Sequence, residues 1–225
     1  MASHLLNQKR MLQLPFRDRE QAGRLLGEAV KARSLCQDAL VLALPRGGVP
    51  VGYEVAKILG APLDVMVVRK LGFPGQPELA MGAIGSGGVR VLDERLIREV
   101  GIFSKNEIER IAAREAHEVE RREQNYRAGR PALDLQGRRV VLVDDGLATG
   151  STMLAAIECV KRLAASAVMV AVPVASRQAG ERVRKLADGY VCLATPESFG
   201  AVGEWYEDFR QTSDADVRKL LEQVC

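Results

Sequence analysis

Two adjacent carboxylates follow a run of apolar residues in the stretch VVLVDDGLATGST, residues 140–152. They are Asp144 and Asp145, and a turn with hydroxyls and a glycine follows at residues 149–152. Such a turn at a helix start predicts a phosphate site, because N–H and hydroxyl groups can reach the anion. Carboxylates repel a bare phosphate, so they favour a ligand that also carries hydroxyls or Mg²⁺. A sugar phosphate meets both conditions.

The same stretch lacks the other common phosphate motifs. It has no Gly-Lys-Ser/Thr of a Walker loop and no GxGxxG of a dinucleotide site. The simpler interpretation is that Asp-Asp-Gly is only a turn, with Thr149 or Ser151 as a helix cap. The length and mixed chemistry of the pattern favour a ligand site over this alternative.

A second candidate loop is LPRGGVP, residues 44–50, in which Arg46, Gly47 and Gly48 join an apolar run to a helix start. Ligands of open parallel sheets bind beyond the carboxyl ends of the strands, and this loop stands at such an end. Taken alone, the glycines are equally typical of ordinary turn chemistry. The loop gains weight from the acidic pair that follows another strand.

A third candidate is VVRKLGFPG, residues 67–75, where Arg69 and Lys70 leave an apolar strand. Two cations at that edge suit an anionic group of a ligand. The alternative is a basic pair that is merely solvated. The glycine-rich segment behind it, residues 71–90, predicts a mobile loop with a small hairpin.

Together these motifs resemble those of the type I phosphoribosyltransferases, over roughly residues 40–210. Members of that family bind phosphoribosyl pyrophosphate and place a cis peptide in the loop that holds the pyrophosphate. The resemblance implies three subsites in this chain. They are Asp144 and Asp145 for the ribose hydroxyls; Gly146, Ala148, Thr149, Gly150, Ser151 and Thr152 for the 5-phosphate; and Arg46, Gly47, Gly48, Arg69 and Lys70 for the pyrophosphate.

The resemblance also implies a reaction. It is the Mg²⁺-dependent transfer of a phosphoribosyl group to a nitrogenous base or related nitrogen acceptor, with release of pyrophosphate. Asp144, Asp145, Arg69 and Lys70 would be the catalytic residues, and the two aspartates would serve as indirect ligands of the metal. The arrangement looks most like the uncharacterised bacterial phosphoribosyltransferase-like proteins. The alternatives are a non-catalytic regulatory protein that binds a nucleotide or phosphoribosyl pyrophosphate, and a phosphosugar hydrolase.

The acceptor is left open by one departure from the family pattern. Members that act on 6-oxopurines have an Asp at the position of Ala148, where it meets the purine ring. The C-terminal stretch resembles in outline the hood of purine-type members, which implies that Phe199, Trp205 or Tyr206 stacks on a base. An equally good interpretation is that these aromatic residues anchor the tail to the core.

The elements that must position these residues alternate along the chain. The pattern predicts one α/β domain over residues 1–225, with an open, mostly parallel sheet flanked by helices. The predicted strands are residues 39–44, 63–68, 139–143, 167–174 and 190–193, and the predicted helices are residues 18–37, 49–59, 151–163 and 177–187.

Three segments interrupt or extend this alternation. They are the lid at about residues 71–90, closed by a strand at 89–92; a helical insert at about 93–130; and a small hood at about 195–225. Within the insert, a capping box at Ser104 and Glu107 opens a long charged helix that ends at Tyr126. We expect this helix to pack across a partner subunit of a homodimer or to shield the site.

The composition excludes several classes of protein. Among the 225 residues, 32 basic and 29 acidic residues are interleaved, so no basic footprint for nucleic acid is present. The four cysteines are far apart, which indicates neither a zinc site nor a disulfide framework. No apolar run is long enough to predict a membrane span. A reducing, cytoplasmic location is expected.

Overall fold

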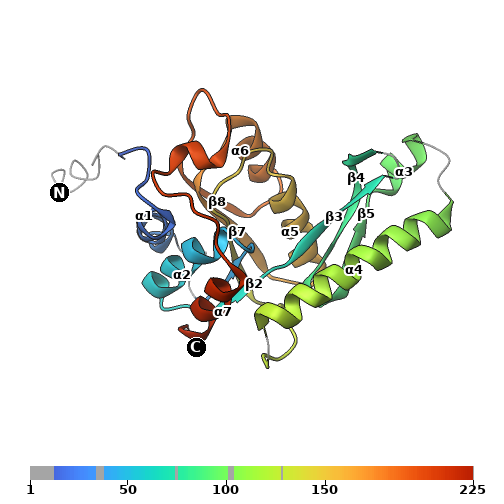
Figure 1. Ribbon diagram of the computed structural model, residues 1–225, viewed down its shortest axis with the longest axis horizontal. Helices are drawn as coiled ribbons and strands as arrows, with labels where there is room; N and C mark the ends of the chain where they lie inside the picture. Colours follow the sequence, from blue (N-terminus) through green and yellow to red (C-terminus); the bar gives the residue numbers. More distant parts are fainter. Residues whose placement is uncertain (1–12, 34–37, 74–75, 101–103, 128, 225) are drawn as a thin grey trace.

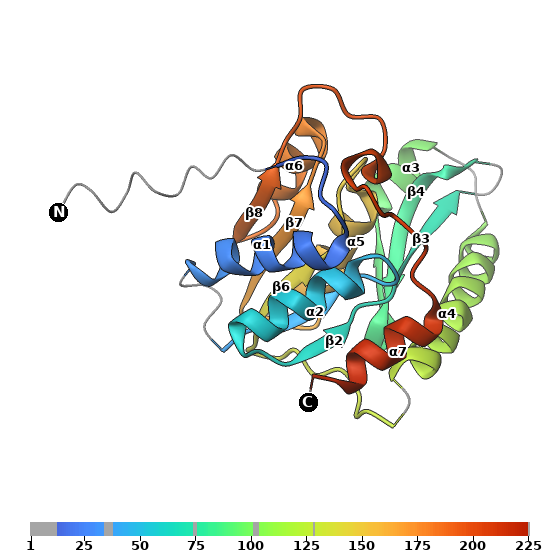
Figure 2. The ribbon, with the colours of Figure 1, turned by 60° about the vertical axis from the view of Figure 1, so that its left-hand side comes forward.

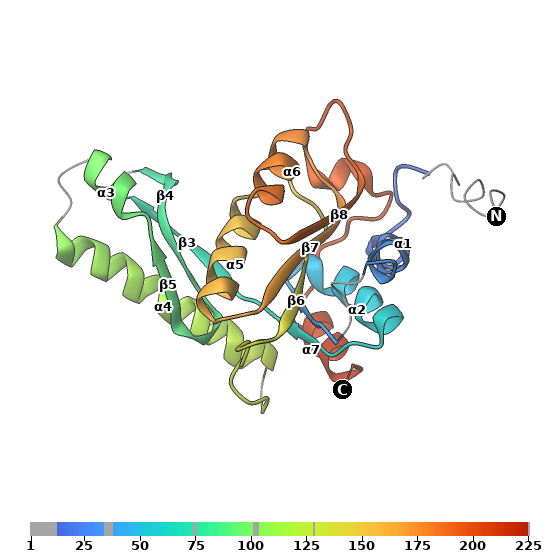
Figure 3. The same cartoon turned by 180° about the vertical axis from the view of Figure 1, so that it is seen from behind.

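The computed structural model describes residues 13–33, 38–73, 76–100, 104–127 and 129–224. A five-stranded parallel sheet forms its centre, in the order β2-β1-β6-β7-β8. The sheet is seen in Figures 1 and 3 with helices on both faces. Its strands are β1 (Leu40–Ala43), β2 (Leu63–Val65), β6 (Arg139–Val143), β7 (Ala167–Val174) and β8 (Gly189–Ala194). The predicted α/β class is confirmed.

Two groups of helices cover the sheet. Helices α1 (Arg19–Lys31) and α2 (Gly48–Leu59) lie together on one face, as Figure 2 shows. Helices α5 (Ser151–Arg162) and α6 (Arg177–Arg184) belong to the apolar core on the other face. Burial on both faces explains why these strands are continuous apolar runs rather than alternating ones.

A second, antiparallel sheet corrects the prediction for residues 63–90. Its strands are β3 (Val68–Phe73), β4 (Gln76–Gly85) and β5 (Val89–Leu92), in that order. The predicted strand 63–68 therefore divides between two sheets, and most of the expected lid loop is strand. The glycines misled the prediction because they permit close strand contact: a Cβ on Gly82 would lie 2.2 Å from the Val91 carbonyl oxygen. Residues 74–75 of the expected lid lie outside the described residues.

The predicted insert forms two helices, α3 (Glu94–Val100) and α4 (Lys105–Arg127), which lie beside the antiparallel sheet in Figure 1. The capping box is confirmed, since Ser104 N–H donates to Glu107 Oε2 at 2.9 Å and Glu107 N–H donates to Ser104 Oγ at 3.2 Å. The buried residues of α4 are Ile108, Ala112, Glu115, Val119 and Tyr126.

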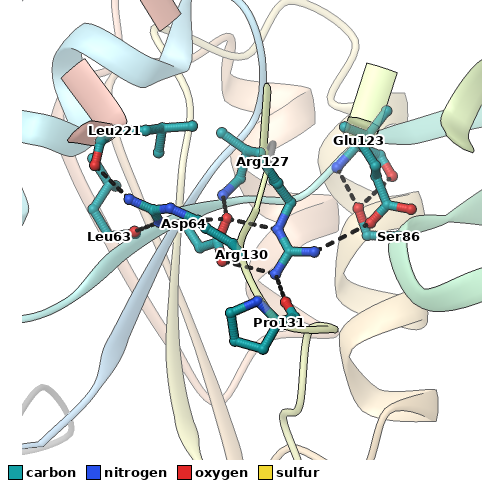
Figure 4. A network of polar contacts seen from close by, with 10 residues as sticks. Leu63, Asp64, Ser86, Glu123, Arg127, Arg130, Pro131 and Leu221 are labelled. Carbon is teal, nitrogen blue, oxygen red and sulfur yellow. Dashed lines mark hydrogen bonds and ion pairs between the residues drawn. The ribbon is translucent and has the colours of Figure 1, made fainter. Parts of the chain in front are cut away.

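A buried ion pair fastens the end of α4 to the central sheet, as Figure 4 shows. Arg127 donates two hydrogen bonds to the carboxylate of Asp64 in β2, from Nε to Oδ1 at 2.9 Å and from Nη2 to Oδ2 at 3.0 Å. Arg130 donates to the carbonyl oxygens of Leu63 at 2.7 Å and of Leu221. These contacts join the insert, the edge strand and the C-terminal helix.

The tail adds a 3₁₀ turn, η3 (Val202–Trp205), and a helix, α7 (Asp214–Glu222). This helix was not predicted, although a capping box at Ser213 and Asp216 opens it. Val217 and Leu221 bury its inner side. Among the described residues, no helix combines the length and the apolar character that a membrane crossing requires.

Candidate functional site

The loops that follow β1 and β6 touch at the carboxyl edge of the central sheet. The glycines make this approach possible, because a Cβ on Gly47 would lie 2.0 Å from Asp145 Oδ2. A Cβ on Gly48 would lie 2.9 Å from the Cα of Asp144. The peptide bond between Pro45 and Arg46 is cis, as the family resemblance implies. The structure thus brings together the first and second sets of predicted residues.

The acidic pair lies half-buried at this edge. Burial raises the pKa of Asp144 well above its usual value, and the neighbouring charge of Asp145 raises it further. The pKa of Asp145 is also raised by burial, but the Arg19 guanidinium opposes that shift. Asp144 Oδ1 accepts the backbone N–H of Asp145 at 2.9 Å, which fixes its orientation. Asp144 and Asp145 are therefore two desolvated carboxylates that are held in fixed orientations.

Arg19 of helix α1 is a member of the site that sequence reasoning missed. Its Nε lies 2.9 Å and its Nη2 2.8 Å from Asp145 Oδ2, and its guanidinium carbon lies 3.8 Å from the Phe209 ring centroid. Its Nη1 donates to the carbonyl oxygen of Arg210 at 2.8 Å. No local pattern around residue 19 signals this role, because the contact arises only when α1 packs across the sheet.

The aromatic residues of the tail contact each other and the core. Tyr206 is 5% exposed, its ring lies 5.6 Å from that of Phe16, and its Oη donates to the Asp145 carbonyl oxygen at 2.5 Å. The rings of Phe199 and Trp205 stack at 6.1 Å. A buried ring offers no face to a base, so the structure favours the anchoring interpretation for Tyr206.

The predicted phosphate turn forms the start of helix α5. Gly150 has a φ of 73°, a left-handed conformation that favours glycine. Thr149 Oγ1 and Ser151 Oγ lie 3.2 Å apart. Arg182 of α6 places a cation beside the turn, since its Nη1 donates to the Thr149 carbonyl oxygen at 3.3 Å. The side chains of Ala148, Thr149 and Thr152 are exposed at this end of the sheet.

Arg69 and Lys70 are placed differently from the expectation. They lie within strand β3 of the antiparallel sheet rather than in a loop at the edge of the parallel one. Arg69 Nε donates to Glu115 Oε2 at 2.9 Å, and the Glu115 side chain is 9% exposed. Arg69 therefore neutralises a buried carboxylate of helix α4. Its ion pair in the structure is with Glu115 rather than with a ligand group.

Two cavities adjoin the loop after β1, and Arg46 lines both. One, of about 340 Å³, is bounded by residues of three regions: Arg19, Arg46, Gly47, Asp145, Phe209, Gln211 and Thr212. The other, of about 210 Å³, is lined by Pro45, Arg46, Arg121, Arg122, Tyr126 and Asp214. Neither lining includes Arg69 or Lys70.

Comparisons with known proteins agree with this geometry. Residues 22–209 match the family model described as the phosphoribosyl transferase domain. The chain is 46% identical over 209 residues to "Putative phosphoribosyl transferase Rv0571c" of Mycobacterium tuberculosis strain H37Rv, and equally to the protein MT0597 of strain CDC 1551. The match takes in 93% of this chain and 47% of each relative, so the chain spans about half their length.

A solved structure is similar as well. The crystal structure of TT1426 from Thermus thermophilus superposes with a TM-score of 0.85 at 46% identity, and the match covers 93% of this chain and 99% of that one. The family model covers most of the chain, and the matched region contains both strand-end loops and the phosphate turn. The chain therefore belongs to the phosphoribosyl transferase domain family.

Proposed function

We propose that the chain transfers a phosphoribosyl group from phosphoribosyl pyrophosphate to a nitrogen acceptor and releases pyrophosphate. One observation carries the proposal: Gly47 and Gly48 lie against the acidic pair, so a pyrophosphate loop and a ribose site share one edge. Asp144 and Asp145 would accept the ribose hydroxyls. The turn at residues 148–152 would hold the 5-phosphate.

The reaction breaks the bond between C1 of the ribose and the pyrophosphate oxygen, and forms a bond from C1 to the acceptor nitrogen. Positive charge develops on the ribose while the leaving group gains negative charge. Fixed charges aimed at these centres stabilise such a state. Arg46 would neutralise the pyrophosphate, and the carboxylates of Asp144 and Asp145 would hold the ribose beneath it.

Magnesium fits this donor set as a partner of the substrate. Mg²⁺ is typically held by one or two carboxylates together with phosphate oxygens and water. The described residues contain no group of three His, Cys, Asp or Glu side chains that could hold a metal by themselves. Asp144 is the better candidate ligand, because Arg19 already engages the carboxylate of Asp145. The ion would neutralise the leaving group when bound.

The acceptor is proposed only as a nitrogen nucleophile. Ala148 offers no hydrogen bond from its side chain to a base, and its carbonyl oxygen accepts from Ser176 Oγ at 2.6 Å. Of the three aromatic residues, Phe199 and Trp205 remain candidates for base contact, whereas Tyr206 is buried. Arg69 and Lys70 remain predicted pyrophosphate ligands, although Arg69 is paired with Glu115.

Thermal unfolding with ligand tests the proposal. Phosphoribosyl pyrophosphate with Mg²⁺, at about 100 times its Kd, should raise the Tm by about 5 °C, which corresponds to about 2.7 kcal/mol of binding linkage. Asp144→Asn should abolish this shift because it removes a carboxylate that the ribose hydroxyls need. The exposed control Asp134→Asn should keep it. A wild-type Tm that does not move at millimolar ligand would exclude the proposed donor.

Pyrophosphate release separates an enzyme from a regulatory binding protein. The wild-type chain is incubated with the donor, Mg²⁺ and a panel of nitrogenous bases, and pyrophosphate is followed over time. Release with one base identifies the acceptor. Tight binding without release for any base would contradict the transferase and favour the regulatory alternative.

A further inference from the structure

The smaller cavity beside Arg46 is lined by cations from the insert. Arg121 and Arg122 of helix α4 join Arg46 of the loop after β1, and Asp214 of helix α7 is the only anionic residue among the described residues of the lining. The cavity of about 210 Å³ is far larger than one water molecule requires. Three guanidinium groups around such a space predict an anion of more than one charge.

The two α4 arginines are held in place by Glu118. Arg121 gives Glu118 two hydrogen bonds, from Nε at 2.8 Å and Nη2 at 3.0 Å, and Arg122 gives it one from Nε at 2.6 Å. A guanidinium has five N–H donors, so Glu118 uses one of those that Arg122 offers. The Arg122 side chain is 33% exposed and lines the cavity. Arg122 therefore lines the cavity with N–H donors that Glu118 does not use.

Arg46 connects this cavity to the acidic pair. It lines the cavity of about 210 Å³ and also the cavity of about 340 Å³ that includes Gly47 and Asp145. The two spaces therefore share one lining residue. A ligand that occupied both cavities would lie against Asp145 in one and against Arg121 and Arg122 of helix α4 in the other.

We propose that Arg121 and Arg122 of the insert helix bind the terminal phosphate of the diphosphate group, while Arg46 binds the phosphate next to the ribose. This inference rests on the proposed function and adds to it a role for the insert. The insert helix is then part of the diphosphate site. Arg69 is a poorer candidate, because its partner Glu115 lies seven residues before Arg122, about 10 Å away along the helix.

In the structure, the carboxylate of Asp214 pairs with Arg46, the residue proposed to bind a phosphate. Its Oδ1 lies 3.5 Å from Arg46 Nη1 and accepts from Tyr126 Oη at 2.9 Å, while its Oδ2 accepts from Asn125 Nδ2 at 2.9 Å. These contacts keep the carboxylate ionised and close to the cation. A diphosphate must therefore compete with Asp214 for Arg46.

Calorimetric titration of the full chain tests the inference with two probes, inorganic pyrophosphate and ribose 5-phosphate, both with Mg²⁺. The double variant Arg121→Gln with Arg122→Gln should weaken pyrophosphate binding by about tenfold or more, since two charge-assisted contacts are lost. Ribose 5-phosphate affinity should stay within about twofold, because its site lacks these residues. Arg110→Gln, on the exposed side of the same helix, is the matched control and should change neither affinity.

A second variant, expected to raise rather than lower pyrophosphate affinity, distinguishes a specific effect from a loss of folding. Asp214→Asn keeps an acceptor for Tyr126 but removes the competing charge, so pyrophosphate affinity should rise by about threefold. Unchanged pyrophosphate binding in the double arginine variant, with ribose 5-phosphate still bound, would overturn the inference and leave the proposed function intact. Failure of both probes to bind the wild-type chain would overturn the proposed function, and the inference with it.

Discussion

Two carboxylates that share a half-buried strand end are unfavourable for stability. The raised pKa of Asp144 means that the folded chain binds the proton of this carboxyl group more tightly than the unfolded chain does. At every pH above the unfolded pKa, this raised pKa lowers the free energy of unfolding, because burial disfavours the charged carboxylate. That contribution vanishes below the unfolded pKa of about 3.9, where the group is protonated in both states. Such a cost is typical of a residue kept for binding rather than for stability.

Asp144→Asn should therefore raise the Tm of the ligand-free chain at pH 7.5 by a few degrees. The gain should shrink as the pH falls through the raised pKa, because the wild-type side chain then also becomes neutral. Asn retains the acceptor for the Asp145 N–H, so no hydrogen bond is lost. Calorimetric melting at several pH values measures the effect.

The comparison variant is Asp134→Asn, which changes an exposed carboxylate in the loop before β6. It should leave the Tm nearly constant across the same pH range. A lower Tm for Asp144→Asn, or a gain that does not depend on pH, would contradict the electrostatic explanation.

At this scale the sequence predicts those residues whose neighbours along the chain reveal their chemistry. Asp144, Asp145 and the turn at residues 149–152 are readable because strand, acids and hydroxyls follow one another. Arg19 is not readable, because it reaches Asp145 across 126 positions of the sequence. Its role depends on the packing of α1, which no local pattern encodes.

Among the elements, the insert depends on one buried ion pair for its attachment to the sheet. Arg127→Met would leave Asp64 with its buried carboxylate largely unpaired, since Arg130 approaches it only to 3.8 Å. We expect the free energy of unfolding to fall by about 3 kcal/mol. Urea denaturation followed by circular dichroism gives this value.

The matched control is Arg95→Met, which breaks an ion pair with Glu99 on the surface of α3. The Arg95 side chain is 83% exposed, so little stability should be lost. Equal losses in the two variants would mean that the pair between Arg127 and Asp64 has no special role. Adding Asp64→Asn to the Arg127→Met variant should recover part of the lost free energy of unfolding, because the unpaired charge of Asp64 is then absent.

The ends of a strand could be predicted where its apolar run in the sequence coincides with the segment that the fold pairs in a sheet. The predicted spans of β5, β6 and β7 match the structure residue for residue. The region 63–90 failed because glycine serves both loops and closely packed strands, and only the strand partner distinguishes them. Helix α7 was not predicted, although the sequence contains its capping box and the two apolar residues that are buried on its inner side.

The molecule as a whole combines a parallel sheet buried on both faces with an antiparallel sheet and insert at its side (Figure 1). Amide hydrogen exchange should reflect this difference. Strand β1 is entirely buried, so its amides should exchange among the slowest, whereas α3 buries no residue and should exchange much faster. Exchange followed by mass spectrometry resolves the two regions. Similar protection in β1 and α3 would contradict this ranking.

The contact between Gly47 and Asp145 also constrains how such a chain can change over generations. A side chain at position 47 would overlap the carboxylate at position 145, which Arg19 holds in place. A single substitution at position 47 therefore damages both loops at once. One glycine therefore ties together two loops whose key positions are separated by 97 residues of the sequence.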